Sequence, residues 1–241
     1  MSARAEKAPA PDPDLGGTTG PDSTTELGTT TDLGSTAHLT PGVRSTLTRL
    51  EAARIVPTVR AADADAADEL ARSLLAAGIS TFEFTATTPG WEELVETWSH
   101  REPTATVGLG TVTSPGTAER ALAAGAAFLV SPFQVPEVRP VADRASRLFV
   151  EGGLTPTELR ASALRGVAKL FPAHVGGLAY LRSLRSVLPG ARIMATGGVT
   201  LESAAEWLAA GAFTVSVGSD LTGADDIPAA VERLREQLAR R

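Results

Sequence analysis

The sequence predicts an α/β protein of the (β/α)8 TIM-barrel class, a ring of parallel strands with helices outside. Three observations support this class. From Arg44 onward, short apolar runs alternate with amphipathic segments rich in Ala, Leu, Glu and Arg, eight such pairs fit in about 200 residues, and capping residues or glycines separate them. A doubly wound open sheet also alternates in this way, and the count of eight decides for the barrel.

The expected strands are short runs of apolar and β-branched residues. They lie at Ile55–Arg60, Thr81–Ala86, Thr106–Thr111, Phe128–Phe133, Leu148–Gly152, Val167–Phe171, Arg192–Thr196 and Thr214–Ser219. The expected helices carry apolar residues at helical spacing. They lie at Arg44–Ala53, Ala64–Ala77, Trp91–Thr97, Pro115–Ala124, Pro136–Ala145, Pro156–Leu164, Gly177–Leu188, Leu201–Ala210 and Ile227–Ala239.

Capping residues mark several of these helix boundaries. Thr113-Ser114-Pro115 and Thr155-Pro156 place a hydroxyl before a proline in the first turn, and Glu158 supplies an acid at the third position of its helix. Glycine closes other helices, because it adopts the left-handed conformation that a helix end requires. These glycines are Gly78, Gly125, Gly166 and Gly211.

The composition changes near residue 43, which divides the chain into a tail (1–43) and a barrel domain (44–241). The first 43 residues contain no Phe, Trp or Tyr and repeat an imperfect unit at Asp14-Leu15-Gly16, Glu26-Leu27-Gly28 and Asp32-Leu33-Gly34. Such a segment buries too little apolar area to offset the entropy of ordering it. We expect a disordered Thr/Gly/Pro-rich tail; the alternative is a partner-binding motif that folds on contact.

Composition also excludes several classes of function. The net charge of −6 gives no support to binding of nucleic acid or of a membrane surface, since both need a concentrated positive field. The absence of cysteine excludes disulfides and thiolate sites, and no His/Asp/Glu cluster has metal-ligand spacing. No apolar stretch is long enough to span a bilayer or to read as a signal peptide. We expect a cytoplasmic protein without a metal or other cofactor.

Two charged residues stand at expected strand ends, where barrel enzymes hold their active sites. Lys169 shares a strand face with Val167 and Phe171, and Glu83 shares one with Thr85. Charged groups that point into an apolar barrel are costly to bury, so they generally have a partner or a function. The alternatives are that Lys169 extends to solvent from a loop or strand and that Glu83 faces solvent on an edge strand.

Four segments at strand ends resemble one family. They are Val167–Ala173 (VAKLFPA), Phe82–Thr85 (FEFT), Gly108–Thr111 (GLGT) and Ala195–Val199 (ATGGV). Together they resemble the 2-keto-3-deoxy-6-phosphogluconate (KDPG) aldolases, a family that includes the 6-phosphogalactonate-specific and the 4-hydroxy-2-oxoglutarate (KHG) aldolases. The resemblance runs from about Arg54 to Leu221, and Lys-Leu-Phe-Pro-Ala is its most specific block.

The resemblance implies a role for each matching residue. Lys169 matches the lysine that forms the Schiff base, and Glu83 matches the acid/base carboxylate. The positions that line the family's pyruvyl pocket are Arg60, Thr111, Pro132 and Phe171. Those that hold the far end of the substrate and its phosphate are Thr196, Gly197, Gly198, Gly218 and Ser219. The resemblance also implies a homotrimer.

The chemistry agrees with these implied roles. A lysine attacks a carbonyl only as the free amine, so burial or a nearby cation must lower its pKa. The expected function is cleavage of a phosphorylated 2-keto acid, a 2-keto-3-deoxy-6-phospho sugar acid, to pyruvate and glyceraldehyde 3-phosphate. The alternatives are a 4-hydroxy-2-oxoglutarate aldolase, a noncatalytic sugar-phosphate-binding relative, and another phosphate-binding barrel such as an isomerase or epimerase, against which Lys-Leu-Phe-Pro argues.

The sequence departs from the family's pattern at two positions. Thr87 stands where typical KDPG aldolases have an arginine. The galactonate-type members also lack this arginine, and Trp91 is a further likeness to those members. Glu151 replaces the usual proline after the fifth strand, as either a solvated loop acid or a substrate contact. His174 follows the lysine block, and we expect no catalytic role for it because the scheme already has its acid/base.

Overall fold

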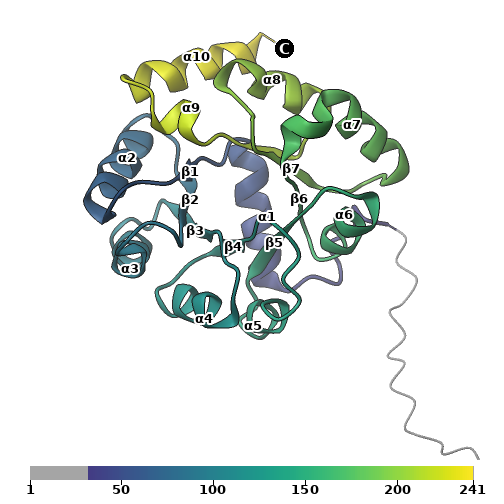
Figure 1. The fold of residues 1–241 in the computed structure, drawn as a ribbon, viewed down its shortest axis with the longest axis horizontal. Helices are drawn as coiled ribbons and strands as arrows, with labels where there is room; N and C mark the ends of the chain where they lie inside the picture. The colour runs from purple at the N-terminus through teal and green to yellow at the C-terminus, as the bar shows by residue number, and fades with distance from the viewer. Residues whose placement is uncertain (1–31, 241) are drawn as a thin grey trace, which may run out of the picture. The chain divides into compact units, whose positions relative to one another are not determined.

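The computed structural model describes residues 32–240 and shows eight parallel strands paired in chain order. The strands are β1 (Thr58–Val59), β2 (Thr81–Thr85), β3 (Thr106–Gly110), β4 (Phe128–Val130), β5 (Leu148–Gly153), β6 (Ala168–Leu170), β7 (Ile193–Thr196) and β8 (Thr214–Ser216). Figure 1 shows the ring of strands viewed roughly along the barrel axis. The ring closes where Val56 N donates to Val215 O at 2.8 Å and Thr58 N donates to Val217 O at 3.1 Å. The predicted barrel class is confirmed.

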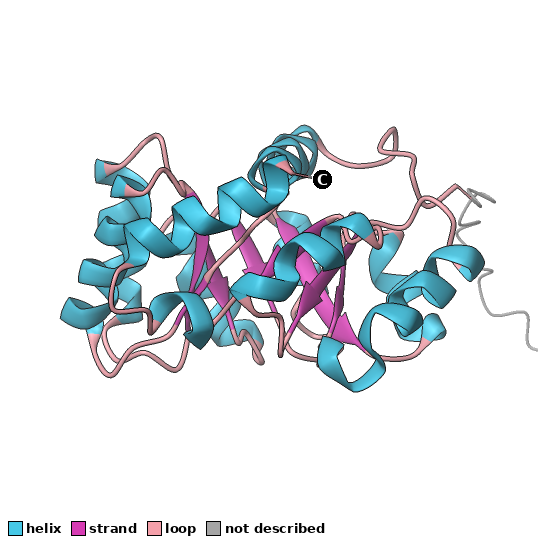
Figure 2. Ribbon diagram, turned by 90° about the horizontal axis from the view of Figure 1, so that it is seen from above, coloured by secondary structure: helices cyan, strands magenta, loops and turns pink. Residues whose placement is uncertain are grey.

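Helices surround the strands on the outside, as the side view in Figure 2 shows. They are α2 (Ala64–Ala76), α3 (Trp91–Arg101), α4 (Pro115–Ala123), α5 (Arg139–Arg144), α6 (Pro156–Ala163), α7 (Ala173–Val187), α8 (Leu201–Ala209), α9 (Ser219–Thr222) and α10 (Ile227–Ala239). The predicted helix at Pro136 begins three residues later, and α7 begins earlier than predicted and is interrupted by Gly177 (φ 63°). None of these helices is long and apolar enough to cross a membrane.

The predicted capping residues act as expected. The Ser114 side chain accepts the Thr117 amide at the start of α4, and Thr155 and Glu158 form a reciprocal capping box at the start of α6. The four predicted helix-closing glycines all have a positive φ, between 79° and 127°. Local sequence chemistry therefore sets the lengths of several helices.

Apolar side chains pack in two layers, inside and outside the ring. Phe128, Val150, Val167 and Met194 belong to the inner cluster, which also contains Leu50 of the first helix, α1 (Pro41–Ala53). In Figure 1 this helix lies behind the strands, across the end where they begin. Since α1 fills the amino-terminal end of the barrel, the inside of the ring is open only at its carboxyl-terminal end.

The chain before α1 packs against the barrel, which corrects the predicted tail boundary at residue 43. Leu33 and Leu39 are only 5% and 9% exposed, and Val43 is also buried. Arg192 Nη2 donates to Gly34 O at 2.7 Å, and a ring nitrogen of His38 lies 2.7 Å from Leu164 O. Residues 32–43 therefore belong to the folded unit; the predicted disorder of residues 1–31 lies outside the described residues.

Truncation separates these two parts of the predicted tail. A chain that begins at Asp32 should unfold at the same urea concentration as the full chain. A chain that begins at Gly42 should lose roughly 3 kcal/mol or more, because each fully buried Leu contributes roughly 1.5–3 kcal/mol and the Thr40 cap adds about 1 kcal/mol. Equal midpoints for the two truncated chains would show that Leu33 and Leu39 contribute nothing.

Candidate active site

Lys169 lies inside the barrel on β6. It pairs in register with Gly152 of β5 and Met194 of β7, and its neighbour Val167 belongs to the inner apolar cluster. The residue is only 6% exposed. The chain has just two lysines, Lys7 and Lys169, so every other basic residue of the barrel is an arginine. Burial within a strand excludes the alternative of a lysine that extends to solvent from a loop.

Glu83 lies on β2 and is 2% exposed, so it does not face solvent on an edge strand. Thr58 Oγ1 donates to Glu83 Oε1 at 2.9 Å and lies 2.8 Å from Ser216 Oγ. Gly110 leaves room for the carboxylate, because a Cβ there would stand 2.6 Å from Oε1. The other oxygen, Oε2, is buried without a hydrogen-bond partner among the described residues. This oxygen is therefore the one whose hydrogen-bonding capacity is unused.

Burial favours the uncharged forms of Lys169 and Glu83, so it shifts their pKa values in opposite directions. Burial lowers the pKa of Lys169, and the nearby Arg60 lowers it further, while the negative charge of Glu83 opposes the change. Burial likewise raises the pKa of Glu83, and Lys169, Thr58 and Arg60 act in the opposite direction. The lysine is thereby favoured in the neutral form that can attack a carbonyl.

An aromatic ring covers the lysine. Lys169 Nζ lies 5.1 Å from the centre of the Phe171 ring. Gly197 also lies against this ring, where a Cβ would stand 3.0 Å from a ring carbon. Phe171 therefore contacts both the lysine and the β7–α8 loop.

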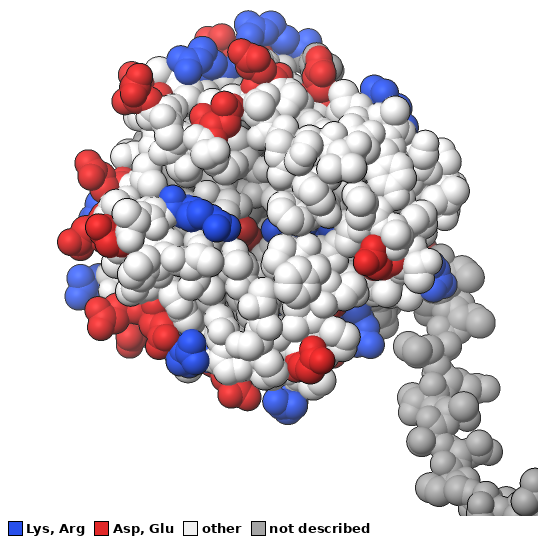
Figure 3. Space-filling model, in the orientation of Figure 1, with Lys and Arg blue, Asp and Glu red and all other residues white. Residues whose placement is uncertain are grey.

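A cavity of about 670 Å³ lies at the carboxyl ends of β1, β7 and β8. Predicted residues that line it are Arg60, Thr196, Gly197, Gly198, Gly218 and Ser219. Thr196 Oγ1 is buried without a hydrogen-bond partner among the described residues, and Gly197 and Gly198 both have a positive φ. Figure 3 shows this end of the barrel as a mainly uncharged surface, with basic and acidic atoms inside its central hollow. The hollow offers backbone donors and one arginine to an anion.

Two predicted pocket residues lie elsewhere around the mouth. Thr111 follows β3 at φ 60°, and its Oγ1 accepts a long hydrogen bond of 3.4 Å from Arg60 Nη2. Pro132 follows β4, and its carbonyl packs so closely on Gly152 that a side chain at Gly152 would collide with it. Both are at strand ends, as predicted, but neither lines the cavity beside β7 and β8.

The position of Glu151 differs from both alternatives that the sequence suggested. It is buried on the outer face of β5, where it forms an ion pair with Arg139 and accepts the Val135 amide at 3.2 Å. Because Lys169 pairs with Gly152, the adjacent residue of β5 must face the helices. Glu151 is therefore a buried structural acid, not a solvated loop residue or a substrate contact.

The other residues singled out beside the site have structural contacts. His174 packs against Gly198, and its Nδ1 lies 3.3 Å from Gly197 O. Trp91 is buried in the outer layer with Arg120 over its ring. Thr87 Oγ1 lies 3.0 Å from Thr85 Oγ1.

Sequence reasoning missed three polar residues of the site. Thr58 and Ser216 support Glu83, and Asp220 lines the cavity while its Oδ2 accepts the Leu201 amide at 2.6 Å. Strand alternation places Thr58 on the same face as Arg60, and this pattern could have identified Thr58 from the sequence. Asp220 lies in α9, a helix too short to produce a periodic pattern. Among residues 32–240, no group of His, Asp and Glu could hold a metal ion.

Comparison with known proteins identifies relatives of this arrangement. A family model described as KDPG and KHG aldolase matches residues 46–233. The 2-dehydro-3-deoxy-6-phosphogalactonate aldolase of Escherichia coli is 30% identical over 69% of this chain and 82% of its own. The 2-dehydro-3-deoxy-phosphogluconate aldolase of Dickeya dadantii is 30% identical over 73% and 84%. A KDPG aldolase of Legionella pneumophila, solved with pyruvate as a covalent carbinolamine intermediate, superposes with a TM-score of 0.69 at 27% identity, covering 80% of this chain and 97% of its own.

The electrostatic coupling of the two buried groups can be tested without a substrate. Replacing Glu83 with Gln removes the negative charge that raises the pKa of Lys169, so the amine should lose its proton at lower pH. Reductive methylation of Lys169, followed against pH by peptide mass, should shift its midpoint to lower pH in E83Q. The surface variant E92Q is the control and should match the original chain. An unchanged or higher midpoint in E83Q would contradict the coupling.

Proposed function

Because the chain belongs to the KDPG and KHG aldolase family, we propose that it is a lysine-dependent aldolase that cleaves a 2-keto-3-deoxy-6-phospho sugar acid to pyruvate and glyceraldehyde 3-phosphate. The observation that supports this most strongly is the only lysine of the barrel, buried inside it together with Glu83. Neither group is needed to close the barrel, and each is costly to bury. A noncatalytic relative would have no use for the pair.

In the proposed reaction the neutral Lys169 amine attacks the C2 carbonyl of the 2-keto acid. Glu83 supplies the proton that lets the hydroxyl of the resulting carbinolamine leave as water, which gives an iminium. The electron pair of the C3–C4 bond then moves into an enamine as the iminium nitrogen is neutralised, and Glu83 takes the proton of the C4 hydroxyl. The aldehyde leaves. Glu83 returns this proton to C3, which gives the iminium of pyruvate. Water then attacks the iminium and gives a proton to Glu83, and the resulting carbinolamine breaks down to pyruvate and the free lysine.

The geometry supports a proton-transfer role for one oxygen of Glu83 in particular. Oε1 accepts from Thr58, which fixes the carboxylate plane, whereas Oε2 has no partner among the described residues. A raised pKa suits this oxygen to both halves of the reaction, since the group must give a proton in one step and take one in another. Thr58 would serve as a positioning residue.

The cavity beside β7 and β8 is the proposed site of the substrate's far end. Its glycine backbone and the hydroxyls of Thr196 and Ser219 offer donors to a phosphate, and Arg60 supplies a positive charge. Asp220 repels the two charges of a phosphate more strongly than the single charge of a distal carboxylate, and this observation favours 4-hydroxy-2-oxoglutarate as the second candidate substrate. Because the Asp220 carboxylate accepts a hydrogen bond from the amino terminus of α8, we place the phosphorylated six-carbon acids first, without choosing between epimers. A homotrimer and a cytoplasmic location stay predictions.

Trapping with pyruvate and borohydride tests the covalent step. The reduced adduct should appear on Lys169 and not on Lys7, the other lysine of the chain. Replacing Lys169 with Ala should abolish trapping and lower turnover by several orders of magnitude, because the covalent route is lost. E83Q should still bind pyruvate while cleavage falls by roughly 10²–10⁴-fold. A mass on Lys7, or an active enzyme that yields no adduct, would overturn the assignment.

A substrate panel tests the phosphate proposal. Steady-state rates on both phosphorylated epimers, their unphosphorylated forms and 4-hydroxy-2-oxoglutarate should show the lowest KM for a phosphorylated acid. D220N should lower that KM by roughly two- to fivefold, since a charge beside a helix terminus is typically worth 0.3–1 kcal/mol. It should leave the unphosphorylated sugar acids, whose far end is uncharged, and pyruvate trapping unchanged. The control D225N should change none of these values. A preference for the unphosphorylated five-carbon acid would refute the phosphate proposal but not the lysine mechanism.

A further inference from the structure

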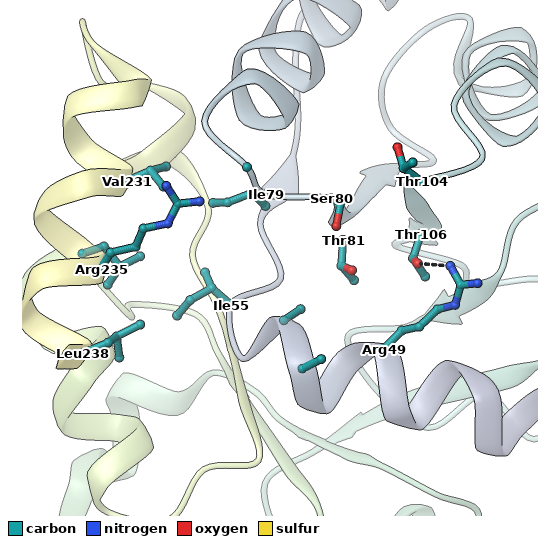
Figure 4. Close-up of a pocket in the computed structure, with 14 residues that line it drawn as sticks. Arg49, Ile55, Ile79, Ser80, Thr81, Thr104, Thr106, Val231, Arg235 and Leu238 are labelled. Atoms are coloured by element: carbon teal, nitrogen blue, oxygen red, sulfur yellow. Dashed lines mark hydrogen bonds between the residues drawn. The ribbon is translucent and has the colours of Figure 1, made fainter.

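A second cavity, of about 420 Å³, lies at the opposite end of the barrel from Lys169 (Figure 4). Its walls come from α1, from α10 and from the residues at which β2 and β3 begin. Ile55, Ile79, Leu234 and Leu238 are among its apolar side chains. The inner apolar cluster and α1 separate it from the mouth of the barrel. It therefore belongs to neither part of the proposed active site.

The polar side chains of this cavity are all hydrogen-bond donors to an anion. Four hydroxyls, Ser80, Thr81, Thr104 and Thr106, line it together with Arg49 and Arg235, and none of its lining residues is acidic. In Figure 4 the hydroxyls lie between the two arginines, with Arg235 entering from α10 and Arg49 from α1. Although the chain has a net charge of −6, no residue that lines this cavity is negatively charged.

Both arginines line the cavity, and Arg49 is held there by a hydrogen bond. Arg49 Nη1 donates to Thr106 Oγ1 at 3.1 Å, and no carboxylate of residues 32–240 forms an ion pair with it. The Arg235 guanidinium lies against Gly78, where the absence of a side chain leaves room for it. Its ion pair with Glu232 is long, 3.7 Å, and half exposed, so it is weak. Both guanidinium groups keep N–H donors available.

We propose that this cavity is a second binding site, for a small organic anion. A carboxylate or phosphate group would be held by Arg49, Arg235 and the hydroxyls, and an aliphatic body would lie against Ile79 and Leu238, which are only partly buried. The apolar wall favours a ligand with a carbon chain over an inorganic ion, because only such a ligand removes that wall from water. The arginines favour an anion over a neutral molecule of the same shape.

Three probes with the same six-carbon chain separate the contribution of the arginines from that of the apolar wall. Hexanoate, hexyl phosphate and hexan-1-ol are titrated into the full-length protein, and binding is followed by amide NMR shifts. Both anions should shift the amides of Ser80 and Thr104 saturably, and hexan-1-ol should bind at least tenfold more weakly. R49Q and R235Q should each weaken binding of the anions at least fivefold. R233Q, a change to an arginine of α10 that does not line the cavity, should have no effect.

Each contrary result is distinguishable. Equal affinity for hexan-1-ol would mean a plain apolar crevice, and shifts confined to Gly198 and Ser219 would place the anions in the proposed active site only. Absence of saturation would also overturn the proposal. If an arginine variant unfolds, the salt dependence on the unchanged protein replaces it: added NaCl should weaken binding of the two anions and leave hexan-1-ol unaffected. A salt-independent anion affinity would contradict the proposal.

Discussion

The burial of one lysine amine inside an apolar barrel is the constraint on which the site depends. Lys169 pairs with Gly152 and Met194 and is covered by Phe171, so solvent contributes little to its solvation. An isolated charged ammonium in that place is costly, and two responses lower the cost: the amine loses its proton more easily, and Glu83 supplies an opposite charge. The first response makes the group a nucleophile, and the second puts a proton carrier beside it. Burial of the Lys169 amine therefore explains both its neutral form and the position of Glu83 beside it.

Glycines create the space that these buried groups need. Gly110 faces the Glu83 carboxylate, and Gly108 faces the Phe128 ring, which fills the barrel below it. Gly152 lets the chain after β4 approach β5 at the level of the lysine. A methyl group at these positions would displace the Glu83 carboxylate, the Phe128 ring or the backbone after β4, respectively. The glycines of the Gly108–Thr111 motif therefore shape the inside of the barrel, in addition to any contact that the mouth makes with an anion.

Features set by local chemistry were predictable from the sequence. Strand alternation placed Lys169 and Glu83 inside, and the capping hydroxyls and closing glycines marked helix ends, because each depends on a few neighbouring residues. Features set by distant contacts were not. Arg192 binds Gly34, which lies 158 positions away, so the segment before α1 looked like part of a tail. Glu151 has its partner on another element, and α9 is four residues long. The functional roles of the pocket residues rest on the family resemblance and await the experiments above.

The state of the Lys169 amine is the most direct measure of the central claim. Because the chain has two lysines, a protein labelled with 13C at the lysine ε-carbon gives two signals that can be titrated with pH. One signal, absent from a Lys169→Met variant, should titrate well below the ordinary lysine pKa of about 10.4, and the other, from Lys7, should remain in the variant. If the signal that the variant loses titrates at or above the ordinary value, Lys169 is not an activated amine, and the account of the buried pair is wrong.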